Sequence, residues 1–152
     1  MKKFEFTGET KTISLFFRTA TLHRIRAVAE FGLVKVGDLG GWIEKEENLS
    51  HEGKAWIWGN AKVCGDAKVF SARHVLVIGA IGSRDDFTTF YRDKDNEITV
   101  KCGCFLGKID KFLEKVTQTH GDSNYALVYR AAVEVARLQI DLSGEAPKDA
   151  DE

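Results

Sequence analysis

The segment Ala55-Trp-Ile-Trp-Gly-Asn-Ala61-Lys-Val-Cys-Gly-Asp-Ala67-Lys-Val repeats itself every six residues, and weaker copies extend the pattern over residues 49–81. The first position of most copies is small and the third is β-branched, while Gly53, Gly59 and Gly65 occupy the fifth. Recurrence at one fixed period is typical of a solenoid. Glycine followed by Asn, Asp or Lys favours a tight corner, and the branched third residue is then expected to point inward.

This pattern resembles the hexapeptide repeat of left-handed parallel β-helices, in which three six-residue faces form one triangular coil. We therefore expect a short left-handed parallel β-helix over residues 49–81. Five and a half repeats make fewer than two coils, so neighbouring segments must cover both ends. The Trp56-x-Trp58 pair, taken to lie on one face, leaves apolar surface that favours a homo-oligomer.

The sequence on either side of the repeat predicts strands before it and a hairpin with two helices after it. Apolar and β-branched residues favour strands at 2–7, 11–17 and 21–27, the first two joined by a turn at Gly8-Glu9. Alternation predicts hairpin strands at 86–92 and 97–105.

Helical spacing of apolar residues predicts a helix over 108–119 that ends before Gly121, and a second helix from Asp122-Ser123 to about Ile140. The predicted class is α+β, with a single domain over residues 1–142. Its parts are the N-terminal strands and cap (1–48), the repeats (49–81), the hairpin (82–105) and the helix pair (108–140), followed by a flexible tail (143–152).

Composition limits the classes of partner. The 152 residues include 22 basic and 23 acidic side chains, so a net charge of −1 gives no basis for general nucleic-acid or membrane binding. No apolar run approaches the length of a membrane span. Three cysteines, an odd number, favour reduced thiols and a cytoplasmic location.

The loop after the repeat carries the strongest candidate for a binding site. Ser83 and Arg84 follow Gly82, so backbone N–H groups, a hydroxyl and a guanidinium could all face one phosphate or carboxylate. The alternative is that Arg84 only pairs with Asp85, Asp86 or a helix end.

The strand that follows adds hydroxyl and aromatic candidates. Alternation places Thr88 and Phe90 on one face and Thr89 and Tyr91 on the other, and an aromatic ring beside hydroxyls could hold a base or sugar. A half-buried strand that uses its preferred residue types is the alternative. His120, at the end of the first predicted helix, is expected to stabilise the helix terminus or to contact a ligand beside Arg84.

Other motifs do not indicate catalysis. The Cys102-Gly-Cys104 motif lacks a second ligand pair at zinc-finger spacing, so it is interpreted as a closely packed strand. The chain has no Ser-His-Asp order, P-loop or GxGxxG fingerprint, so we predict no catalytic residue, metal ligand or cofactor.

Two longer signatures, Val36-Gly-Asp-Leu-Gly-Gly-Trp-Ile-Glu before the repeats and Gly82-Ser-Arg…Cys102-Gly-Cys-Phe…His120-Gly after them, resemble a family of small β-solenoid proteins of phages and prophages. The family has no established activity, so the resemblance implies a fold and a setting only. We expect a non-enzymatic protein that sequesters a small anion, such as a nucleotide-derived host-defence signal. The alternatives are an inhibitor that contacts a host defence protein, a structural assembly module and an acyltransferase-like enzyme of the hexapeptide-repeat type.

Overall fold

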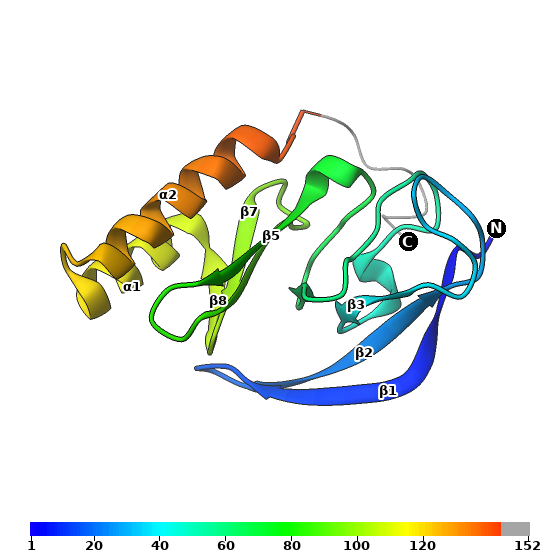
Figure 1. Ribbon diagram of the computed structural model, residues 1–152, viewed down its shortest axis with the longest axis horizontal. Helices are drawn as coiled ribbons and strands as arrows, with labels where there is room; N and C mark the ends of the chain where they lie inside the picture. The colour runs from blue at the N-terminus through cyan, green and yellow to red at the C-terminus, as the bar shows by residue number, and fades with distance from the viewer. Residues whose placement is uncertain (144–152) are drawn as a thin grey trace.

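The computed structural model describes residues 1–143 and contains two four-stranded sheets with a pair of helices on the second sheet (Figure 1). The first sheet has the order β1-β2-β3-β4 and the second has the order β5-β6-β7-β8. Strand pairing is antiparallel except between β3 and β4. The predicted tail, apart from Ser143, lies outside the described residues.

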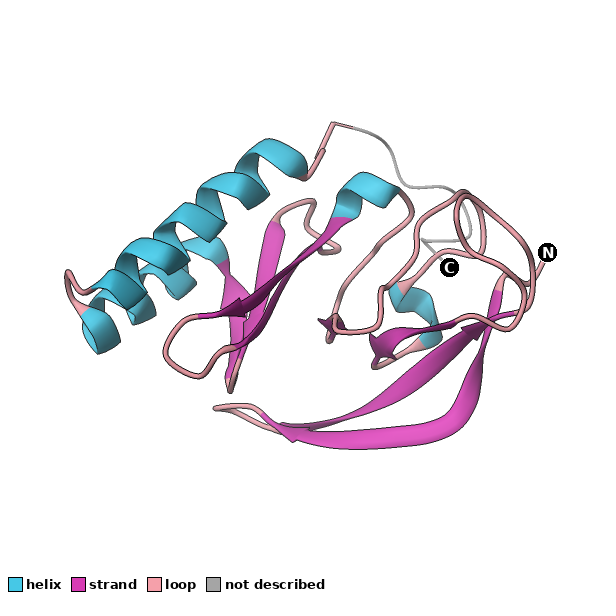
Figure 2. Cartoon of the chain, viewed as in Figure 1, coloured by secondary structure: helices cyan, strands magenta, loops and turns pink. Residues whose placement is uncertain are grey.

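The elements of the N-terminal half are as follows, in chain order: β1 (Phe4–Ser14), β2 (Thr19–Ala27), β3 (Leu39–Ile43), η1 (Glu46–Asn48), β4 (Lys62–Val63) and η2 (Ala72–His74). Those of the C-terminal half are β5 (Val75–Ile81), β6 (Asp86–Arg92), β7 (Ile98–Cys102), β8 (Phe105–Lys108), α1 (Ile109–His120) and α2 (Asn124–Gln139). Figure 2 shows how little regular structure lies between β3 and β5.

The predicted left-handed β-helix is wrong. Within residues 49–74 the regular elements are the two-residue strand β4 and the short helix η2, and parallel pairing is limited to β3 with β4 and a bridge between Leu49 and Val69. The family resemblance to β-solenoid proteins therefore has no support in the fold, and the phage setting drawn from it has none either.

Hydrogen bonds from side chains outside the repeat explain why the repeat does not stack into coils. The amide of Asn48 donates to the carbonyls of Gly65 and Ala67, and the buried Tyr91 hydroxyl donates to the carbonyl of Cys64 at 2.8 Å. Thr89 Oγ1 accepts the N–H of Lys62. These bonds use the backbone groups that a stacked coil would need, so the repeat closes against the second sheet.

The inward direction of the repeat's third position is confirmed for the three central copies, whereas His51, Val75 and Ile81 are only partly buried. Ile57, Val63 and Val69 are buried in the first core, which also holds the small first-position residues Ala55 and Ala61. The Trp56-x-Trp58 pair does not share a face, because Trp56 is buried and Trp58 is half-exposed. The tryptophan pair therefore no longer supports a homo-oligomer, and the homo-oligomer stays a prediction.

The flanking elements match the sequence more closely. Strands β6 and β7 form the predicted hairpin, and α1 and α2 begin and end within a residue or two of the expected positions. The second hairpin strand, expected over 97–105, ends at Cys102, because a turn at Gly103 reverses the chain into β8. The interpretation of Cys102-Gly-Cys104 as a closely packed strand is therefore wrong. Gly121 ends α1 with a positive φ of 57°. The predicted hairpin at Gly8-Glu9 is wrong, because β1 continues through a bulge there and turns only at residues 15–18.

Both helices pack on one face of the second sheet (Figure 1). Their apolar faces enclose a second core with the sheet residues Phe90 and Val100. The opposite face of the sheet points toward the first core through Tyr91. Alternation along β6 therefore places neighbouring residues in different cores, as the sequence predicts. The strand ends at one side of this sheet line a pocket.

Candidate functional site

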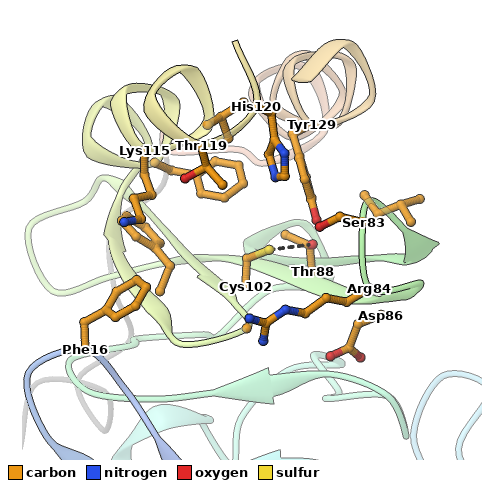
Figure 3. A pocket seen from close by; sticks show the side chains of 15 residues that line it. Phe16, Ser83, Arg84, Asp86, Thr88, Cys102, Lys115, Thr119, His120 and Tyr129 are labelled. Carbon is orange, nitrogen blue, oxygen red and sulfur yellow. Dashed lines mark hydrogen bonds between the residues drawn. The ribbon is translucent and has the colours of Figure 1, made fainter. Parts of the chain in front are cut away.

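A cavity of about 160 Å³ lies between α1, Tyr129 of α2 and the strand ends at one side of the second sheet, and we call it the helix–sheet pocket (Figure 3). The turn between β5 and β6 supplies Ser83 and Arg84, and β6 supplies Thr88. The C-terminal half of α1 supplies Lys115 and His120. Four of the predicted site residues, Ser83, Arg84, Thr88 and His120, are thus brought together.

The other three predicted site residues lie elsewhere. Thr89 accepts a hydrogen bond from the Lys62 N–H, and Tyr91 is fully buried with its hydroxyl bonded to Cys64. Burial raises the pKa of Tyr91 well above its ordinary value. Phe90 is fully buried in the second core. These three side chains stabilise the cores and do not line the pocket.

Arg84 does not form the structural ion pair that was the alternative interpretation. Among residues 1–143, no carboxylate lies within ion-pair distance of its guanidinium. The guanidinium lies against the backbone of Gly103, where an added Cβ would be 3.6 Å from Nη1. Figure 3 shows the side chain reaching across the mouth of the pocket.

Lys115 is the second cation of the pocket, and sequence reasoning missed it because it lies on the exposed side of an ordinary amphipathic helix. Its Nζ sits 4.8 Å from the centroid of the Phe16 ring, and within the described chain it has no carboxylate partner. Asp86 also lines the pocket, and its carboxylate accepts its neighbour Phe87's N–H at 2.7 Å. Two cations against one anion give the pocket a positive balance even with His120 neutral.

Polar groups on the pocket floor are already partly connected. The hydroxyl of Thr88 donates to Cys102 Sγ at 3.4 Å, and the Tyr129 hydroxyl lies close by (Figure 3). Burial, followed by the nearby Cys102 thiol, raises the pKa of Tyr129. Cys102 and Cys104 are free thiols, and no cluster among the described residues has three side chains able to hold a metal ion.

A second cleft, of about 520 Å³, lies between the two sheets and is electrostatically different. Arg18 forms a bidentate pair with Glu44, and Lys108 contacts Asp93 at 2.7 Å and Asp95 at 2.9 Å. Burial lowers the pKa of Lys108, but the hydrogen bonds that its ammonium donates to Asp93 and Asp95 outweigh this effect, so the pKa is raised. Because its charges are paired with one another, this larger cleft has less to offer an ion than the helix–sheet pocket.

Fold and pocket together define an α+β protein with a small, cation-rimmed pocket between a helix pair and a sheet. No protein-family model matches the chain. The chain is 29% identical over 80 residues to the uncharacterized acetyltransferase YdcK of Escherichia coli (strain K12), an alignment that covers 45% of this chain. It spans only 24% of that protein's length. Among the described residues, neither helix has the length and apolar character needed to cross a bilayer.

Proposed function

We propose that the chain is a non-catalytic cytoplasmic protein that binds a small anion in the helix–sheet pocket. The observation that carries the proposal is that Arg84 and Lys115 face one cavity while neither has a carboxylate partner within the described residues. A guanidinium that makes no internal ion pair keeps its donors available for a carboxylate or phosphate. Ser83 and Thr119 add hydroxyl groups at the same rim.

The pocket has room for a small ligand rather than for a large substrate. Its volume of about 160 Å³ is smaller than that of a typical cofactor site, and its walls are mostly apolar. Sequestration of a nucleotide-derived host-defence signal, and inhibition of a host protein by direct contact, stay predictions.

The anion-binding test compares Arg84→Ala with Arg73→Ala by isothermal titration calorimetry and thermal melting. The probes are orthophosphate, benzoate and adenosine 5′-monophosphate. Both arginines are exposed, so each change removes one charge at little cost in stability, but only Arg84 lines the pocket. Loss of a charge-assisted contact is expected to weaken binding by Arg84→Ala roughly tenfold to a hundredfold.

Equal weakening by both variants would mean that only the general charge of the protein matters, and the pocket proposal would be wrong. A lower melting temperature for Arg84→Ala without a specific loss of affinity would make Arg84 a structural residue.

Acyl transfer is the second candidate, favoured by the similarity to the acetyltransferase. Three of the four histidines have structural surroundings: His23 stacks on Phe6, His51 stacks on Phe4, and His74 is buried. His120 is the remaining imidazole and lines the pocket. Transfer of the acetyl group from acetyl-coenzyme A to an amine or hydroxyl acceptor, with release of coenzyme A, would establish this function in place of simple binding if the activity is lost in His120→Ala.

A further inference from the structure

Aromatic rings form much of the wall of the helix–sheet pocket. Phe105 and Phe112 lie with ring centroids 5.4 Å apart, and Phe112 meets Tyr129 edge-to-face at 5.7 Å. The His120 ring stacks on Tyr129 at 5.7 Å with an interplanar angle of 26°. A cluster of this kind offers both ring faces and ring edges, which aromatic ligands prefer in offset or edge-to-face contact.

A fifth ring reaches the pocket from the other sheet. Phe16 lies in the turn between β1 and β2, and its backbone N–H donates to the carbonyl of Cys104 at 3.0 Å. Lys115 Nζ lies over the ring, but Phe16 as a whole residue is nevertheless 65% exposed. Its neighbour Phe17, equally exposed at 64%, lines the second cleft instead. Phe16 is thus positioned by contacts with distant parts of the chain but is not buried by them.

The positions of the cations match this arrangement. In Figure 3, Phe16 and Arg84 lie on opposite sides of the pocket mouth, with Lys115 and His120 on the helix above them. A ligand that lies across the mouth can therefore place a ring near Phe16 and an anionic group near Arg84. The cavity volume of about 160 Å³ is close to that of engineered cavities that hold one benzene molecule.

We infer, on the basis of the anion-binding function proposed above, that the ligand carries a single aromatic ring and an anionic group. The ring contacts Phe16 and the wall formed by Phe105 and Phe112, and the anion contacts Arg84. Phe16 is then a specificity-determining residue that selects a planar ring over a saturated ring of equal charge. A small aromatic carboxylate or aryl phosphate has this chemistry.

The test titrates the full chain at pH 7.5 with benzoate, cyclohexanecarboxylate and acetate, which carry the same charge. Wild type is expected to bind benzoate about three- to tenfold more tightly than cyclohexanecarboxylate, the factor that an aromatic pair contributes beyond its buried area. Phe16→Leu should reduce this preference to within about twofold, because a leucine keeps the apolar contact but loses the ring. Phe17→Leu, the matched control in the second cleft, should keep it.

Phenyl phosphate tested against benzoate, which carries the same ring, distinguishes a phosphate from a carboxylate ligand, and phenyl phosphate tested against orthophosphate repeats the test of the ring. A preference for benzoate that survives in Phe16→Leu would overturn the role of Phe16. Equal, Arg84-dependent affinities for benzoate and cyclohexanecarboxylate would overturn the aromatic ligand while the anion site stands. Failure of every probe to bind would overturn the anion-binding function as well.

Discussion

At the scale of single residues, His74 shows how burial fixes a protonation state. Its Nδ1 accepts the N–H of Phe70 at 3.3 Å, and the Phe70 ring meets the imidazole edge-to-face at 4.2 Å. Burial, followed by the charge of Arg92, lowers the pKa of His74 to about 4 although Asp141 acts in the opposite direction. The imidazole is therefore neutral in the folded protein at pH 7.

This depressed pKa predicts a loss of stability in mild acid. The unfolded chain takes up a proton near pH 6.5 and the folded chain only near pH 4, so the contribution of neutral His74 is lost as the pH falls between these values. The free energy of unfolding should therefore fall more steeply from pH 7 to pH 4.5 for wild type than for His74→Gln, by up to about 3 kcal/mol. Urea titrations at both pH values measure this difference.

An equal fall in unfolding free energy from pH 7 to pH 4.5 in wild type and His74→Gln would contradict the lowered pKa of His74. The change His23→Gln is the control for the substitution itself, because it makes the same replacement at a partly buried site in β2.

Residue chemistry alone predicted part of the pocket lining. The Gly-Ser-Arg sequence marked the β5–β6 turn correctly, because polar groups after a glycine at the end of an apolar strand have few partners nearby in the chain. Phe16 and Lys115 were missed, since their roles depend on a contact between segments about a hundred residues apart. Two consecutive phenylalanines in a turn, Phe16 and Phe17, were the available signal.

At the scale of elements, local patterns predicted the hairpin and helices well because their bonds are made within short segments. The repeat was different. Its period identified the buried side chains of the central copies, but burial of Ile57 and Val63 is equally satisfied by packing loops against a separate sheet. Which backbone carbonyls are bonded by Asn48 or Tyr91 depends on tertiary contacts, so the sequence period could not distinguish a coil from a loop.

Gly41 in β3 and Gly59 in the repeat should differ strongly in their response to substitution by alanine. A Cβ at Gly41 would overlap the carbonyl oxygen of Trp58 and lie 2.7 Å from that of Ala61, so strand β3 would have to move from the loop packed on it. We expect Gly41→Ala to cost roughly 3 kcal/mol of unfolding free energy. Gly59 faces open space and has no left-handed φ, so Gly59→Ala should change stability by less than about 1 kcal/mol.

Thermal melting and urea unfolding of the two variants provide the measurement. Similar stability of Gly41→Ala and wild type would show that β3 does not pack closely on residues 57–61.

At the scale of the whole molecule, the helix–sheet pocket depends on both sheets. The β1–β2 turn is joined to the β7–β8 turn by the hydrogen bond from the Phe16 N–H to the Cys104 carbonyl. The two helices cover the face of the second sheet that points away from the first sheet (Figure 1). A binding site formed by three such segments requires the complete fold. The large, internally ion-paired cleft at Lys108 lies beside the same β1–β2 turn and provides a natural comparison within one molecule.

The most direct test of the anion site is to titrate ¹⁵N-labelled protein with benzoate and to map the amide chemical-shift changes. The changes are expected to concentrate at residues 83–88, 102–105 and 115–121 and at Phe16. Changes concentrated instead around Glu44, Asp93 and Lys108 would place the anion in the second cleft and contradict the pocket assignment.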